Sequence, residues 1–330
     1  MRRYIFHSTK RNNYMHTIRI IAGAEILALF RERTMYSITA VFLVMAAAAS
    51  FIGWSTFTTA EAIYKASVIY LHTNGVSTVP DNPLRTVPSL ASFDNLIIYI
   101  ALIGALLAII IGHRSIMRER RSGIMQVLFT RPISKSIFIV GKVAGLGLVL
   151  LVITSTTAFI SITTSFLLPL QHLTVSDIGH LVAFFALSFL YMLLFALIGL
   201  LFAIIAKSES LALFVPICIW VGVTFVLPEL ATGLTPTALL NPVTLLQLPP
   251  SVGFFQVAER ILFPISLAWH YTTMSGELLG SSFNQSIPVR DVFMSHLREL
   301  ATLLGSIGIV GGFAIAALQR FDTRSDAVNE

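Results

Sequence analysis

The fold is decided by residues 118–135, RERRSGIMQVLFTRPISK, a charged segment that lies between two long apolar runs. The run before it is residues 95–112, NLIIYIALIGALLAIIIG, and the run after it is residues 137–168. Each is long enough to cross the hydrocarbon core of a bilayer, which takes about 20 helical residues. Lys and Arg concentrated beside two membrane spans are typical of a cytoplasmic loop. The sequence therefore predicts a helical hairpin in the membrane with a shaped, charged turn in the cytoplasm.

The composition extends this prediction to the whole chain. Of the 330 residues, 55% are hydrophobic and only 12% are charged, about half the charge of an average soluble domain. Six apolar segments carry no Lys, Asp or Glu at their centres, as the cost of burying charge in hydrocarbon demands; they are Tyr36–Ser55, Asn95–Gly112, Ile137–Leu168, Leu181–Ala206, Leu211–Leu227 and Leu300–Leu318. We predict an all-α integral membrane protein with six transmembrane helices.

The distribution of basic residues predicts the orientation. With the N terminus inside, the cytoplasmic segments hold 17 Lys and Arg and the outer segments hold five. Both termini are therefore expected in the cytoplasm, and residues 321–330 form a cytoplasmic tail. The net charge of +6 reports this asymmetry and calls for no nucleic-acid partner.

The single cysteine and the scattered histidines exclude some classes of site. Cys218 lies in the middle of a predicted span, so the chain forms neither a disulfide framework nor a thiolate metal cluster. His270 near Met274 and His296 near Met294 are only pairs, whereas a metal ion needs three or four convergent ligands. No metal site is expected.

Residues 1–35 are expected to form a cytoplasmic N-terminal region with an amphipathic helix over Thr17–Met35. Its apolar and charged residues follow a helical spacing, with Ile18, Ile21, Ile26, Leu29 and Phe30 set against Arg19, Glu25, Arg31, Glu32 and Arg33. One interpretation is a helix that lies on the inner membrane surface among the lipid headgroups. The other is a plain cytoplasmic extension of the first span.

Residues 56–93 are expected to form an outer loop, and residues 228–299 a larger exterior region. The exterior region holds seven of the 13 prolines yet stays apolar, so we predict short helices in the outer leaflet between spans five and six. One is predicted over Ser251–Phe263, with Trp269 and Tyr271 as headgroup anchors. Its apolar face is interpreted either as an external gate or as a self-packed cap, and the residues concerned are Phe254, Phe255, Ile261 and Leu262.

The third span carries hydroxyl side chains on one helical face. They belong to Thr154, Thr157, Ser161 and Thr164. One interpretation is that they line a translocation pathway. The more common role of such residues is to bond their own backbone or a neighbouring helix.

The order of these features resembles the permease subunits of ABC-2 type transporters, most closely the copper-processing and gliding-motility permeases. The resemblance covers the layout of nearly the whole chain and is most specific within residues 118–142. The residues that carry it are Glu119, Gly123, Leu128, Pro132, Ser134, Lys135 and Lys142, with Leu-Asn-Pro at 240–242. Members of the family usually carry Thr and Glu where this chain has Ile124 and Gln126.

The resemblance implies a six-span permease domain over residues 36–320 whose cytoplasmic loop, residues 114–135, docks into a cytosolic ABC ATPase. Docking would use Arg118, Glu119, Arg120, Arg121, Gly123, Met125, Leu128, Phe129, Arg131 and Pro132. The other interpretation is that the arginines only fix topology and touch lipid headgroups. The family also implies a second permease copy or homologue as dimer partner, contact with membrane lipids, a candidate extracytoplasmic partner, and a bacterial or archaeal cytoplasmic membrane as location.

The P-loop pattern Gly-x-x-x-x-Gly-Lys-Ser/Thr does not occur in the sequence. The chain is therefore expected to be no enzyme and to bind no cofactor, with ATP and Mg²⁺ held by the partner subunit. We predict an exporter subunit. The alternatives are a membrane scaffold that regulates a soluble partner and, more remotely, a secondary transporter, although the predicted spans lack the central ionisable residues typical of coupled pumps.

Overall fold

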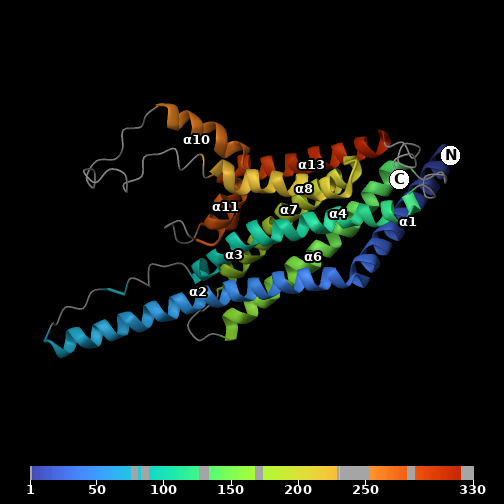
Figure 1. Cartoon of the computed structure of the whole chain (residues 1–330). Coiled ribbons are helices and arrows are strands. Elements are labelled where there is room, and N and C mark those ends of the chain that lie inside the picture. Colours follow the sequence, from blue (N-terminus) through green and yellow to red (C-terminus); the bar gives the residue numbers. More distant parts are fainter. Residues whose placement is uncertain are drawn as a thin grey trace.

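A computed structural model describes residues 2–75, 81–82, 89–125, 134–167, 174–228, 230, 253–280 and 287–320. These residues are nearly all helical (Figure 1), in the order α1 (Arg2–Arg31), α2 (Arg33–Thr73), η2 (Ser89–Phe93), α3 (Asp94–Tyr99), η3 (Ile100–Gly104), α4 (Ala105–Arg121), α6 (Lys135–Leu167), α7 (Val175–Ile205), α8 (Glu209–Val221), η4 (Gly222–Val226), α10 (Gly253–Ile265), α11 (Leu267–Leu278), α12 (Val289–Ser295) and α13 (Leu297–Arg320).

Within the described residues, six helical segments are long and apolar enough to cross a membrane, which confirms the predicted number of spans. They are Arg33–Thr73, Leu90–Arg121, Lys135–Thr164, Val175–Ile205, Glu209–Val226 and Leu297–Arg320. The second span is continuous from the 3₁₀ turn η2 through α3 and the π-helical η3 into α4.

The predicted outer loop over residues 56–93 is wrong in its first half, because α2 continues to Thr73. Residues 56–73 contain neither Gly nor Pro, so nothing in the backbone ends the helix where the membrane does. Helix formation depends on these local preferences, whereas the predicted boundary at Ser55 rested on the thickness of the bilayer alone.

Helix α7 lies at the centre of the bundle and contacts α4, α6, α8, α11 and α13. Its tightest neighbour is α4, and each helix supplies a glycine at their crossing. A Cβ atom added at Gly112 would collide with the carbonyl oxygen of Ala196, and one added at Gly199 would collide with that of Ile109. The two backbones therefore touch directly at this crossing, which small residues permit in membrane helices.

The bundle has two opposite ends (Figure 1). The start of α1 and the end of α13 lie at one of them. We call it the charged end and define it by Glu32, Arg121, Lys135, Glu209 and Arg320, the residues at or next to the ends of α1, α4, α6, α8 and α13. The other, here called the far end, holds the last turns of α2 together with α10 and α11.

Helix α1 is separate from α2, since the backbone is extended at Glu32. It packs along α6 through the buried Ala22, Glu25 and Leu29. The prediction that placed Glu25 on the exposed polar face is wrong, because only 1% of this residue is exposed. Phe30, assigned to the apolar face, is 44% exposed. Whether the exposed side of α1 lies among lipid headgroups stays a prediction.

Several buried polar side chains connect the helices in the far half of the bundle. The Tyr191 ring on α7 stacks on the Tyr271 ring on α11 at 4.4 Å between centroids, and the Tyr271 and Ser188 hydroxyls lie 2.9 Å apart. The carbonyl oxygen of Ala101, in the π-helical η3, accepts hydrogen bonds from Tyr191 and Trp220 at 3.3 Å each. Widened helical turns leave such carbonyls available to neighbouring side chains. The prediction of Tyr271 as a headgroup anchor is wrong, because this side chain is fully buried.

Candidate functional site

Charged contacts join five helices at the charged end. Arg114 on α4 binds Glu32 at the break between α1 and α2. Arg121, the last residue of α4, binds Glu209 at the start of α8, with Nε 3.0 Å from the carboxylate. Lys135 at the start of α6 donates to the carbonyl oxygen of Gln319 near the end of α13. The two helix ends that carry the predicted docking loop are thus tied to α2, α8 and α13.

Four ionisable side chains form a compact cluster between α1, α4 and α6. Glu25 binds Lys142, and Arg118 Nη2 lies 2.8 Å from the same carboxylate. Lys142 also binds Glu119 and donates to the carbonyl oxygen of Ser115 at 3.1 Å. We call these residues, Glu25, Arg118, Glu119 and Lys142, the buried charge cluster. Its two acids and two bases balance, as groups withdrawn from water must.

The centre of the cluster is buried because α1 approaches α6 closely. The side chain of Lys142 is 2% exposed and that of Glu25 is 0% exposed, while those of Glu119 and Arg118 at its edge are 17% and 32% exposed. A Cβ atom added at Gly141 would lie 2.8 Å from Ile21, and one added at Gly145 would lie 2.7 Å from the Glu25 Cβ atom. These two glycines, one turn apart, let α1 lie directly on α6.

Arg120 points to a different helix from its neighbours. Its guanidinium donates to the carbonyl oxygens of Ala203 and Ala206, at 3.0 Å and 2.9 Å. These carbonyls belong to the last turn of α7, where the helix leaves acceptors unpaired and carries partial negative charge. Arg120 therefore anchors the end of α4 to the end of the central helix.

The predicted docking residues thus divide into two groups. Arg118, Arg120 and Arg121 each contact an acceptor within the chain, whereas the resemblance implied that they would be used for docking. Their contact with an ATPase stays a prediction. Leu128, Phe129, Arg131 and Pro132 lie outside the described residues.

The turn after α4 has open space beside Gly123 and an exposed apolar side chain at Ile124. Gly123 has φ of 65°, and a Cβ atom added there would meet nothing within 4 Å. Ile124, the next residue, is an apolar side chain that is 52% exposed, while Met125 is 2% exposed and packs into the core. Gly123 is favoured here because L-residues rarely adopt this left-handed conformation.

The hydroxyl face of the third span is used for packing within the described bundle. Thr154, Thr157 and Thr164 donate to the carbonyls four residues earlier, at 2.8–2.9 Å. Ser161 accepts from Ser50 on α2 at 3.2 Å, and both side chains are buried. Each hydroxyl thus has a protein acceptor or donor, which matches the more common interpretation of such residues. A role in lining a pathway stays a prediction.

The predicted exterior helix is present as α10, Gly253–Ile265, close to its predicted bounds. Ile261 is 55% exposed and Leu262 is partly buried, whereas the side chains of Phe254 and Phe255 lie outside the described part of the structure. Trp269 stacks on Phe263 at 5.3 Å between centroids, so the end of α10 and the start of α11 contact each other across the turn between them. Whether α10 acts as a gate or a cap stays a prediction.

The burial of Glu25 against Lys142 was not predicted, although the sequence contained a signal for it. Glu25 stands inside the apolar run IIAGAEILALF, residues 20–30, and Lys142 stands inside the apolar start of the third span. A charge within an apolar helix face needs an opposite charge nearby. Two such isolated charges of opposite sign therefore indicated a pair, but no pattern in the sequence said that α1 would lie on α6.

Comparison with known proteins identifies the family of this chain. A model of the ABC-2 family transporter proteins matches residues 19–325, a range that includes all six spans. A search of curated proteins gives no match. Members of this family are membrane permeases of ABC transporters, which generally work with a cytosolic ATPase subunit and often form dimers. Because the match covers nearly the whole chain, this multi-pass protein of the cytoplasmic membrane belongs to the ABC-2 family of ABC transporter permeases.

Proposed function

We propose that the chain is the permease subunit of an exporter, driven by a separate ATPase that docks on the charged end around residues 114–135. Within the family, the pattern of the loop favours the copper-processing and gliding-motility permeases. The buried charge cluster is the observation that carries the proposal. It joins the two helices that hold the loop, α4 and α6, to α1, so a push on the loop moves three helices together.

The proposed coupling follows from the stiffness of these contacts. Arg118 and Glu119 lie in the last turn of α4, and both contact partners on other helices. A displacement of the loop by the ATPase therefore reaches α1 and α6 without bending α4 first. The Arg120 contact with the α7 carbonyls carries the same motion to the centre of the bundle. Packed helices respond to such pushes as rigid bodies that change between discrete arrangements.

The docking part of the proposal is tested at Gly123 with a matched pair of variants. Gly123→Asn keeps the left-handed turn, since Asn tolerates positive φ better than most residues. Gly123→Trp adds a large ring where a partner would approach. We expect that a cytosolic ABC ATPase copurifies with wild type and Gly123→Asn from native cells, and that its yield falls at least about tenfold with Gly123→Trp, the change that about 1.4 kcal/mol of lost binding produces.

The control for this pair is the elution profile of the detergent-solubilised protein, which reports folding without the ATPase. Equal ATPase recovery from both variants would contradict docking at this turn. Normal ATPase recovery without any ATP-dependent transport would favour the scaffold alternative.

The orientation is tested by labelling in a Cys218→Ser background. Lys207→Cys lies between α7 and α8 at the charged end, and Lys65→Cys lies on α2 at the far end with its native side chain 67% exposed. An impermeant maleimide added to intact cells should label Lys65→Cys only, because the charged end is proposed to face the cytoplasm. Labelling of Lys207→Cys in sealed cells would reverse the orientation.

A further inference from the structure

Helix α2 is far longer than the membrane requires. Its 41 residues span about 60 Å at 1.5 Å per residue, twice the hydrocarbon core of about 30 Å. Beyond Gly53, which packs against Ser92, no described residue of α2 is buried. Figure 1 shows this part projecting past the other spans at the far end. We call residues 54–73 the α2 extension.

One side of the α2 extension carries uncharged residues at alternating spacings of three and four. They are Thr56, Thr59, Ile63, Ala66, Tyr70 and Thr73, and all six are exposed. Ile63 and Tyr70 are 61% and 69% exposed, which is unusual for side chains of this size in contact with water. This spacing is the a/d pattern by which two helices pack side by side. We call this side the α2 seam.

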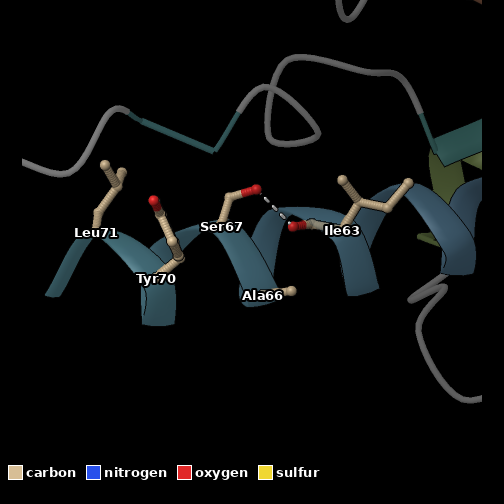
Figure 2. A pocket seen from close by; sticks show the side chains of 5 residues that line it. All are labelled: Ile63, Ala66, Ser67, Tyr70 and Leu71. Atoms are coloured by element: carbon tan, nitrogen blue, oxygen red, sulfur yellow. Dashed lines mark hydrogen bonds between the residues drawn. The ribbon is translucent and has the colours of Figure 1, made fainter. Parts of the chain in front are cut away.

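Three hydroxyl groups on or beside the seam are bonded within α2 itself. The hydroxyls of Thr56, Ser67 and Thr73 donate to carbonyls four residues earlier in their own helix, at 2.8–2.9 Å. Figure 2 shows the Ser67 bond to Ile63, beside a shallow groove of about 460 Å³ between Ile63, Ala66, Ser67, Tyr70 and Leu71. The side chains thus leave methyl groups and rings for a partner to cover.

The charged residues of the extension lie away from the seam. Glu61 and Lys65 form an i,i+4 pair at 2.8 Å, on positions that correspond to the outer side of a helix pair. The seam therefore has no charge that would repel its own copy. An identical helix meets it with the same small and apolar residues at every level, which is the self-complementarity that a two-fold interface needs.

The direction and extent of the seam fit a second copy of this chain. Two copies related by an axis along the membrane normal would place their α2 helices parallel, so that Ala66 faces Ala66. In the membrane part of α2, Val41, Val44 and Ile52 are also 45–67% exposed, although Phe42 and Ala49, which follow in the a/d spacing of the seam, are buried in their own bundle. A stable interface needs about 800 Å² from each partner, more than one short helix provides. The remaining area would come from these exposed side chains of the span.

We propose that the α2 extension pairs with the α2 extension of a second copy to form a parallel two-helix stalk at the far end, outside the cell on the proposed orientation. Helices in proteins gain most of their stability from the packing of an apolar face, and pairing would remove the apolar side of the extension from solvent. The stalk would hold the two permease copies together at a site remote from the ATPases.

Disulfide formation between single cysteines tests this pairing in the full-length chain. In the Cys218→Ser background, Ala66→Cys lies on the seam and Lys65→Cys lies on the outer side. A disulfide needs Cα atoms about 4.4–6.8 Å apart, which parallel seam residues satisfy and outer residues do not. After oxidation of native membranes with copper phenanthroline, we expect at least about ten times more disulfide dimer from Ala66→Cys than from Lys65→Cys, in proportion to the time that each pair spends within that distance.

Two further measurements make the result decisive. Both cysteines are first labelled with a maleimide to show equal accessibility in the reduced protein. Ile63→Glu added to Ala66→Cys should abolish the dimer, because two carboxylates would face each other in the seam, whereas Lys65→Glu should not. Equal dimer from both cysteines, or none from an accessible Ala66→Cys, overturns the proposal. A disulfide from Ala66→Cys to a different polypeptide also overturns it in favour of an extracytoplasmic partner. ATPase copurification is independent of these outcomes.

Discussion

Gly112→Ala should destabilise the protein by about 3 kcal/mol or more, and Gly112→Leu should yield no monodisperse folded protein. A Cβ atom at this position meets the backbone of Ala196 on α7, so no side-chain rotation relieves the collision. Overpacking in a core typically costs about 1–3 kcal/mol when side chains can adjust, and more when they cannot. The midpoint of unfolding in a detergent titration measures the effect. Gly199→Ala should give a similar loss, since it faces Ile109 across the same crossing.

Gly147→Ala on α6 is the matched control for these glycines. A Cβ atom added there meets nothing within 4 Å, so the substitution only improves helix propensity. We expect Gly147→Ala to be neutral or to stabilise the protein by up to about 1 kcal/mol. An unchanged unfolding midpoint for Gly112→Ala would show that α4 and α7 do not cross at this residue.

Lys142→Met should destabilise the protein by about 3–5 kcal/mol, the usual cost of breaking a buried ion pair by removing one partner. The substitution leaves Glu25 and Glu119 buried with only Arg118 as a cation in the cluster. The double variant Glu25→Leu/Lys142→Met should lose less than the sum of the two single variants, because it removes one charge of each sign. Unfolding midpoints of the three proteins give the coupling energy.

Lys65→Met supplies the comparison on the surface. Lys65 also pairs with a glutamate, but the Lys65 side chain is 67% exposed, so its ammonium group is hydrated. Its loss should leave the unfolding midpoint almost unchanged. If Lys142→Met is equally mild, the cluster is not a rigid link between α1, α4 and α6. The proposed path from the loop to the spans would then fail, even if the ATPase still bound.

The hairpin around residues 118–135 shows which parts of the site the sequence predicts well. Its apolar flanks are long and free of charge, so the hydrophobic effect and backbone hydrogen bonding leave a membrane helix as the only stable choice. The Arg residues concentrated after the first of these apolar flanks mark an end of the bundle. Their individual partners were not predictable, because Glu25, Glu209 and the α7 carbonyls lie 83–93 residues away from them in the chain.

Helix α2 shows the converse case, because the thickness of the bilayer gave a wrong prediction of where the helix ends. The bilayer sets how much of a helix must be apolar, but it does not end the helix. The absence of Gly and Pro from residues 56–73 was visible in the sequence and favoured continuation. The exposure of the α2 seam was not visible, since it depends on which neighbouring helices end before α2 does.

The sequence by itself determined the membrane location, the number of spans and the position of the charged loop, because hydrophobic length and local charge are properties of consecutive residues. Only the tertiary structure decided that α1 lies on α6, that Glu25 is buried against Lys142, and that Tyr271 faces Tyr191 instead of the headgroups. These contacts join residues far apart in the chain. They depend on how closely two backbones can approach, which at Gly141 and Gly145 is set by the missing side chains.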